Sequence, residues 1–468
     1  MLTLDHPSKR LFSPGLLLNV LAQLPATKRF LVGYSGGCDS TVLVHAMATI
    51  RDRLPSSELV AVHIDHGLHR DSSAWARHCL ATCNTLGVPC ISQRIEVSMS
   101  ARDRFGLEAA ARSSRYSALS ALMNPGDVLL TAHHQNDQAE TVMLQLLRGS
   151  GAAGLSAMPV VRPFGRGMLA RPLLFFDRCA LRDYATRYDL IWIEDSSNSD
   201  IRYDRNYMRH EVLAPILRRW PRTGAVLERV AKQQAELAAL ADALAATDLQ
   251  RCRIEGAGDN MLSVIELRKM PAIQCRNVIR YWLRSLGLSV PTSSQMEHVL
   301  RDALGAEEDR SPHIRWSGAE LRRYRDVLYA FPPQASHDSS QVIIWNLDRT
   351  SSLTLPAQLG VLAATKTSGG GIRENLLTGK NIVVRFRQGG ETIRPSGRRE
   401  NHVLKKLFQE RGVPPWERSR VPLIYLDGKL IAVADYWIDS SVVARDEQVG
   451  WVLAWQHQLA DDNCQATG

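Results

Sequence analysis

The chain has 468 residues, enough for two to four domains of roughly 150 residues each. Hydrophobic residues make up 45% and charged residues 22%, a globular balance that excludes a largely disordered chain. Lys and Arg total 57 against 48 Asp and Glu, a net charge of +9, which permits a nucleic-acid partner without establishing one.

The eight cysteines are scattered, and no C-x-x-C pair occurs. This spacing argues against a disulfide framework, a zinc ribbon and an iron–sulfur site. The first residues are too polar for a secretion signal, and no apolar run reaches the roughly 20 residues that span a bilayer. We therefore expect a soluble, cytoplasmic protein without a membrane partner.

The first part of the chain alternates short apolar runs with helical stretches. The pattern predicts four strands and four helices; the strands are at 30–34, 59–64, 89–97 and 128–132, and the helices at 41–47, 73–86, 107–123 and 137–147. Strand–helix alternation of this kind is typical of an α/β fold with a doubly wound parallel sheet.

The pattern changes after about residue 215. We predict helices at 224–249, 267–286 and 294–304, a hairpin at 313–331, and one more helix at 401–411. The predicted domains are an N-terminal α/β domain, a mainly helical middle domain, a connector with some strands, and a small α+β C-terminal domain; their boundaries are 1–215, 216–335, 336–380 and 381–468.

A glycine-rich loop lies between the first predicted strand and helix. It reads Ser35, Gly36, Gly37, Cys38, Asp39, Ser40. Adjacent glycines let the backbone approach an anion, and the helix start offers free N–H groups. Asp39 would repel a bare phosphate, which suggests a Mg²⁺ ion between carboxylate and phosphate. The alternative is a plain Gly-Gly turn capped by Asp or Ser.

This S-G-G-x-D-S loop resembles the PP-loop family of ATP pyrophosphatases, which activate a carbonyl oxygen as its adenylate. The Walker A pattern is absent. A G-x-G-x-x-G match at 149–154 follows a predicted helix rather than a strand, so we interpret it as a helix end and a loop. The spacing of His63, His66 and His69 favours a metal site only weakly, because one strand end seldom aims three rings at one point.

A second cluster of polar residues surrounds the predicted helix at 137–147. Asp137 and Glu140 are three apart and share one helix face. They either stabilise the helix dipole or bind a cationic substrate or metal. Arg112 either binds a carboxylate or lies on a solvated face. Together these residues suit a zwitterion with an additional amine, a description that fits lysine; His133 is a further candidate to accept or orient its proton.

The ordered motifs resemble the tRNA(Ile)-lysidine synthetase family over nearly the whole chain. The shared segments include D-H-G-L at 65–68, A-R-x-x-R-Y at 111–116, D-Q-A-E-T at 137–141, L-R-G-S-G at 147–151, the D-x-S-N to R-N segment at 195–206, and the hairpin at 323–326. The resemblance implies a two-step reaction. ATP adenylates carbon 2 of the cytidine at the first anticodon position of tRNA(Ile) with a CAU anticodon, and free lysine then displaces AMP.

The resemblance also implies site residues. The 35–40 loop would bind ATP, with Asp39 on Mg²⁺, and Arg112, His133, Asp137 and Glu140 would serve lysine or catalysis. Residues 381–420 hold ten basic and four acidic residues, a local charge of +6, which favours phosphate binding over a merely solvated face. The predicted tRNA contacts are Arg205, Arg209, Arg394, Arg398, Arg399, Lys405 and Lys406.

The sequence leaves three questions open. The reaction has two alternatives, a PP-loop tRNA thiolase and a non-catalytic tRNA-binding protein that senses nucleotide. The sequence does not decide which group deprotonates lysine. It also leaves the oligomeric state undecided, with a homodimer as the candidate assembly.

Overall fold

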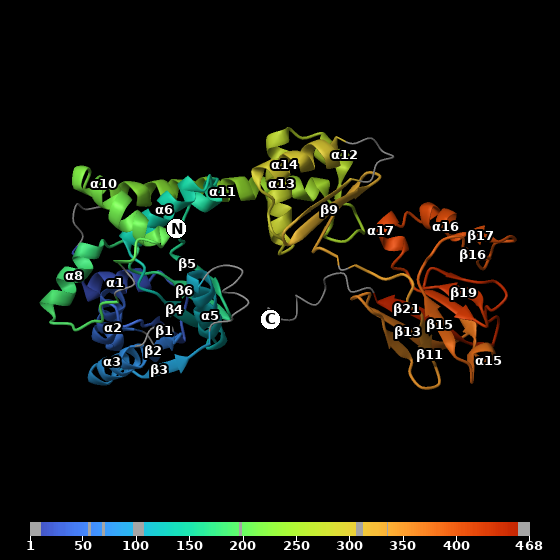
Figure 1. Ribbon diagram of the computed structural model, residues 1–468, viewed down its shortest axis with the longest axis horizontal. Coiled ribbons are helices and arrows are strands. Elements are labelled where there is room, and N and C mark those ends of the chain that lie inside the picture. Colours follow the sequence, from blue (N-terminus) through green and yellow to red (C-terminus); the bar gives the residue numbers. More distant parts are fainter. Residues whose placement is uncertain are drawn as a thin grey trace. The chain divides into compact units, whose positions relative to one another are not determined.

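The computed structural model describes residues 11–54, 58–67, 71–96, 107–195, 199–305, 312–334 and 336–456. The chain divides into two compact units, Met1–Ala243 and Leu244–Gly468 (Figure 1). The four-part division expected from the sequence stays a prediction. No helix within the described ranges is long and apolar enough to cross a membrane.

The first unit is built on a six-stranded sheet with the order β3-β2-β1-β4-β6-β5. Five strands are parallel and β5 is antiparallel to β6. The strands are β1 (Arg29–Gly33), β2 (Glu58–Asp65), β3 (Cys90–Arg94), β4 (Asp127–Leu130), β5 (Val161–Phe164) and β6 (Gly167–Ala170). The expected doubly wound sheet is therefore present.

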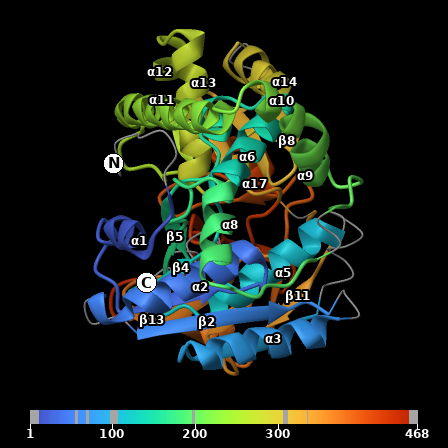
Figure 2. The ribbon, with the colours of Figure 1, turned by 90° about the vertical axis from the view of Figure 1, so that its left-hand side faces the viewer.

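Helices cover both faces of this sheet (Figure 2). Four helices pack into one core with Val32 and Ala61; they are α1 (Pro14–Leu21), α2 (Cys38–Ile50), α3 (Ser72–Thr85) and α8 (Arg178–Arg187). Helix α5 (Leu107–Ala121) packs on the other face, where Leu119 meets Leu31. Alternate strand residues thus enter opposite cores, as a sheet buried on both faces requires.

The predicted elements of this unit agree with the structure to within a few residues, but helices α1 and α8 and the β5–β6 hairpin were not predicted. The hairpin was missed because its two strands have four residues each and one contains Pro163. The predicted strand at 89–97 pairs with β2 only over Cys90–Arg94. Several sequence features lie outside the described residues: Leu68, His69, Val97, the segment 196–198, Cys464 and the first ten residues.

The second unit begins with helices around a small antiparallel sheet. The order is β7-β10-β9-β8, and the strands are β7 (Met261–Ser263), β8 (His313–Trp316), β9 (Ala319–Tyr324) and β10 (Val327–Phe331). Packed with it are the end of α11 (Thr223–Cys252), α12 (Val264–Arg268), α13 (Ala272–Ser285), α14 (Ser293–His298) and the π-helical turn η4 (Val299–Leu304). The helix predicted at 267–286 is confirmed as α13 from Ala272 on, but its start was wrong, because Pro271 separates α13 from the short helix α12.

The rest of this unit is rich in strands. One sheet holds β11 (Ile343–Trp345), β15 (Ile382–Arg385), β18 (Leu423–Leu426), β19 (Lys429–Val433) and β20 (Trp437–Ile438). A second sheet holds β12 (Ser352–Thr354), β13 (Val361–Ser368), β21 (Val449–Gln456) and β14 (Ile372–Arg373). The smaller elements are α15 (Glu374–Leu377), β16 (Thr392–Ile393), β17 (His402–Val403), α16 (Leu404–Glu410) and α17 (Pro415–Arg418). The predicted helix at 401–411 is therefore α16, three residues shorter at its start.

Candidate active site

The glycine-rich loop joins β1 to α2 at the carboxyl end of the sheet. Helix α2 begins after its N-cap Gly37, which has no side chain to cap it. Its first N–H groups and positive dipole end are therefore available to an anion. Ser40 Oγ lies 3.0 Å from Ser35 Oγ and donates to the Gly37 carbonyl at 2.9 Å, which closes the loop on itself.

Gly36 is the position in this loop that requires glycine. Its φ is +85°, and a Cβ at this position would lie 2.6 Å from Ile193 Cδ1. The Ile193 amide also donates to the Gly36 carbonyl at 2.9 Å. Only glycine satisfies both the left-handed backbone and this close approach. The segment around Ile193, which lies far along the chain, thus packs against the loop.

Asp39 and His134 connect this loop to the neighbouring helix. Asp39 Oδ1 is buried and has no hydrogen-bond partner among the described residues. Asp39 Oδ2 lies 3.5 Å from His134 Nε2, and the same nitrogen lies 3.5 Å from Asp137 Oδ2. Burial lowers the pKa of His134, but Asp137, Asp39 and Glu140 outweigh it and raise that pKa overall. His134 was not among the predicted site residues, because the helix that it precedes was expected to begin only at residue 137.

Helix α6 (Gln135–Leu147) presents the acid pair. His134 caps it: its Nδ1 accepts from the Asp137 amide at 3.4 Å, while Asp137 Oδ2 accepts from the His134 amide at 3.0 Å. Burial raises the pKa of Asp137, but the neighbouring His134, Arg205 and His133 overcome it and bring that pKa to about 2. Asp137 is therefore ionised at neutral pH.

Two arginines neutralise the acid pair. Arg205 donates to Glu140 Oε2 at 2.9 Å and to Asp137 Oδ1 at 3.0 Å. Arg209 donates to Glu140 Oε1 at 2.6 Å and lies 3.3 Å from Asp137 Oδ1. Glu140 is only 1% exposed. The sequence assigned the acids to lysine and the arginines to tRNA. In the structure these two groups of residues contact each other directly.

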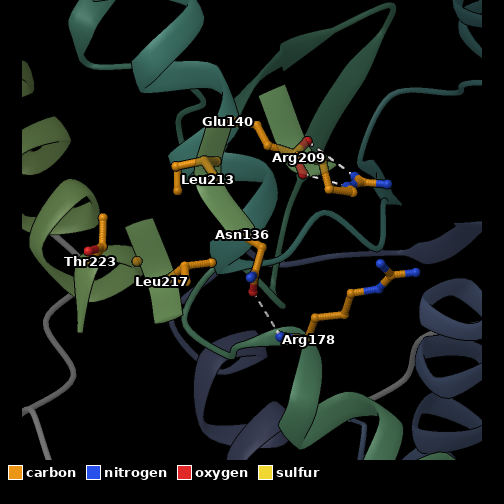
Figure 3. Close-up of a pocket in the computed structure, with 9 residues that line it drawn as sticks. Asn136, Glu140, Arg178, Arg209, Leu213, Leu217 and Thr223 are labelled. Atoms are coloured by element: carbon orange, nitrogen blue, oxygen red, sulfur yellow. Dashed lines mark hydrogen bonds and ion pairs between the residues drawn. The ribbon is translucent and has the colours of Figure 1, made fainter. Parts of the chain in front are cut away.

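A turn of π-helix places Arg209 against the acids. Helix α9 (Asp204–Tyr207) runs into the π-helical turn η3 (Met208–Leu213) and then α10 (Ala214–Arg219). Such wide turns recur at functional sites. A small cavity of about 50 Å³ lies beside them, with Glu140 and Arg209 at one end and apolar Leu213 and Leu217 in its wall (Figure 3). Asn136 lines it too and accepts from the Arg178 amide at 3.0 Å.

His133 and Arg112 occupy different positions relative to this cluster. The ring nitrogen Nδ1 of His133 lies 2.9 Å from Thr131 Oγ1. Burial lowers the pKa of His133 to about 3, with help from nearby arginines, so the ring is neutral at physiological pH. Arg112 is exposed on α5, and its guanidinium lies 5.1 Å from the Tyr116 ring centroid. In the described structure it forms no ion pair with Asp137 or Glu140.

The basic residues of the C-terminal domain are not equally accessible. Arg398, Arg399, Lys405 and Lys406 are exposed, but Arg398 pairs with Glu410 at 2.7 Å, and the half-buried Arg394 donates to Ser440. The ten basic residues counted at 381–420 include two that are buried, Arg418 and Arg420. Arg418 donates to the Val413 carbonyl and the Tyr324 hydroxyl. The surface charge is therefore smaller than the count suggested.

Comparisons with known proteins match three separate parts of the chain to known domains. Residues 15–216 match a PP-loop domain, 262–329 a TilS substrate binding domain, and 382–455 a TilS substrate C-terminal domain. The chain is 44% identical to the tRNA(Ile)-lysidine synthase of Coxiella burnetii over 94% of its length and 96% of the relative. The chain belongs to the tRNA(Ile)-lysidine synthase family.

Other members give the same result. The tRNA(Ile)-lysidine synthase of Methylococcus capsulatus is 40% identical, covering 91% of this chain and 96% of the relative. That of Yersinia pestis is 38% identical, covering 95% and 98%. Membership of the tRNA(Ile)-lysidine synthase family confirms the resemblance drawn from the motifs. The PP-loop domain implies that the protein uses ATP, and the substrate-binding domains imply tRNA as its macromolecular substrate.

Proposed function

We propose that the protein joins free lysine to carbon 2 of the cytidine at the first anticodon position of tRNA(Ile) with a CAU anticodon. The products are lysidine, AMP and pyrophosphate, and the modified tRNA decodes AUA in place of AUG. Full-length similarity to tRNA(Ile)-lysidine synthases supports this reaction. The structural observation that supports this reaction is that His134 Nε2 lies equally far from Asp39 and Asp137. This contact makes the phosphate loop and the acid cluster parts of one site.

In the first step, the loop at 35–40 holds the phosphates of ATP. The serine hydroxyls, which lie 3.0 Å from each other in the loop, and the helix N–H groups would offset the charge that develops on phosphate. The unsatisfied, buried Asp39 Oδ1 fits a cation, since Mg²⁺ favours one or two carboxylates together with substrate phosphates. A bound Mg²⁺ would neutralise phosphate charge during adenylation. Cys38 is a poor nucleophile here, because burial raises the pKa of its thiol to about 11.

In the second step, Asp137 and Glu140 hold the lysine amine. The pKa values of Asp137 and His133 both lie far below 7, so neither group is matched to neutral pH as a general base. We therefore assign Asp137 the orientation of the ammonium, and His133 a neutral hydrogen-bonding role. Arg112, exposed on α5, is the candidate for the lysine carboxylate.

Arg205 and Arg209 connect lysine binding to tRNA binding. An ammonium that binds Asp137 and Glu140 replaces guanidinium contacts with these acids. A released arginine is then free for a tRNA phosphate. Arg394, Arg398, Arg399, Lys405 and Lys406 are the proposed contacts of the C-terminal domain. A homodimer stays a prediction.

Labelled lysine tests the reaction directly. The protein is incubated with ATP, Mg²⁺, labelled lysine and a tRNA(Ile) transcript with a CAU anticodon. ATP-dependent label in the tRNA is expected, and a transcript with uridine at the first anticodon position is the matched control that stays unlabelled. Absence of label, with sulfur transfer to the tRNA instead, would favour the thiolase and contradict the proposal. Nucleotide binding without any covalent change would favour the sensor.

A further inference from the structure

The turn between α10 and α11 is fully open to solvent. All five residues from Arg218 to Arg222 are exposed. At its centre Trp220 leaves 61% of its surface exposed, an unusual state for the largest apolar side chain. Neither the phosphate loop nor the acid cluster uses this residue, so its exposure needs another explanation.

The backbone holds Trp220 in a defined place. Its amide donates to the Ile216 carbonyl at 2.7 Å, and its own carbonyl accepts from the amide and hydroxyl of Thr223 at 3.1 and 2.7 Å. Pro221 stiffens the turn further. The indole is therefore presented on a fixed support, which reduces the entropy that a ligand must overcome.

Three arginines lie next to Trp220 in the sequence. From 214 to 223 the chain holds Arg218, Arg219 and Arg222 and no acidic residue. The Arg219 guanidinium lies 6.0 Å from the Trp220 ring centroid. In the described chain none of the three arginines forms an ion pair with a carboxylate. An aromatic face with unpaired arginines suits an anionic ligand that also carries flat rings, which is the chemistry of single-stranded nucleic acid.

The turn also lies close to the site. Leu213 and Leu217 of the same segment line the cavity that Glu140 and Arg209 share (Figure 3). Trp220 stands between Leu217 and Thr223 in the chain, and both of these residues line the cavity. A strand of RNA whose target base reaches the acid cluster would therefore pass the turn.

We propose that Trp220, with Arg218, Arg219 and Arg222, forms a stacking surface for an unpaired base of the tRNA anticodon loop. This inference rests on the proposed function, because it takes tRNA as the substrate. Unpaired loop bases offer their faces to aromatic side chains, and the arginines meet the adjoining phosphates. A paired stem offers phosphates but no free base face.

Binding of two RNAs by full-length variants tests the surface. The probes are an anticodon stem–loop with CAU and a blunt duplex without a loop, measured by fluorescence anisotropy without ATP or lysine. We expect Trp220→Leu to weaken stem–loop binding about tenfold and leave duplex binding unchanged, while Trp220→Phe stays close to wild type. Arg218→Gln combined with Arg219→Gln weakens both RNAs and lowers the salt slope by about two.

Tyr188→Leu is the matched control, because Tyr188 is another exposed aromatic residue of the same unit. Stem–loop binding by Trp220→Leu at the wild-type level, or an equal loss for the duplex, would overturn the stacking role. A change of oligomeric state with unchanged RNA affinity would instead assign the ring to a protein contact. Lysidine formation by the wild type is a separate readout, so failure of the stacking surface and failure of the proposed function are distinguishable.

Discussion

Glu140 and Arg209 form a short ion pair, 2.6 Å between Oε1 and Nε, although 69 residues separate them in the chain. The carboxylate is buried, and the guanidinium comes from a π-helical turn. A buried charge without a partner is costly, so this pair fixes where the segment at 204–219 packs on α6. The same carboxylate is our candidate for the lysine amine, and we therefore propose that it serves both stability and chemistry.

Replacing Glu140 should separate these two roles. Glu140→Gln leaves Arg205 and Arg209 without their main partner, and we expect the free energy of unfolding to fall by about 3 kcal/mol. Lysine transfer to tRNA should fall more than adenylation, measured as pyrophosphate release. Asp204→Asn is the control, because the Asp204–Arg148 pair is exposed at 3.9 Å and contributes little. An equal loss of both steps would place Glu140 with ATP instead.

The two loop glycines should respond differently to alanine. Gly36→Ala meets Ile193 and a left-handed φ, so we expect it to lose about 1–3 kcal/mol of stability and to weaken ATP binding. Gly37→Ala is the matched control: its φ is −74° and its nearest neighbour is 3.6 Å from the added Cβ. Urea titration and nucleotide binding measure both variants. Similar stability losses in the two would contradict the assigned geometry.

Asp39→Asn tests the proposed Mg²⁺ contact. The neutral amide keeps the shape of the carboxylate, so the fold should retain its stability while pyrophosphate release slows about 100-fold. The Mg²⁺ concentration needed for half-maximal release should also rise. Asp52→Asn, an exposed acid just beyond the other end of α2, is the control. Unchanged Mg²⁺ dependence in Asp39→Asn would remove this residue from the mechanism.

His133 predicts a pH dependence of stability. Its pKa is about 3 in the folded protein, against an ordinary value of 6.5. Below pH 6.5 the unfolded chain therefore takes up a proton that the folded chain refuses, and stability falls by up to roughly 1.4 kcal/mol per pH unit. His133→Asn should flatten this loss in urea titrations between pH 6.5 and 5. Asp137, with a pKa of about 2, stays ionised throughout this range. The control variant is His298→Asn, because His298 is exposed. If His133→Asn leaves the slope of stability against pH unchanged, the low pKa assigned to His133 is refuted.

The C-terminal domain offers a contrast between exposed and buried cations. Lys405→Ala with Lys406→Ala should weaken tRNA binding and lower its salt slope by about two, without loss of stability. Arg418→Met should instead lower the melting temperature, because Arg418 is buried and bonds Val413 and Tyr324. If the lysine variants bind tRNA with the wild-type salt slope, the contact lies elsewhere.

Local sequence patterns were sufficient for much of the fold and for the loop. Apolar runs and helix periods placed β1, β2, β4 and α6 because burial imposes those periods on each segment alone. These patterns did not predict β5 and β6, because two such short strands form only by pairing at the edge of the sheet. They also placed the start of the helix at 267–286 too early, because the apolar period crosses Pro271 although α13 begins only after it.

By itself, the sequence determined the glycine-rich loop, the spacing of the acid pair and the family, because each depends on residue types in a fixed local order. The net charge of +9 was a weak guide, since burial removes Arg418 and Arg420 and salt bridges engage others. Only the tertiary structure brought Arg205 and Arg209 onto Asp137 and Glu140, and His134 between two carboxylates. Those contacts join distant segments through buried charges, which must find partners wherever the fold places them.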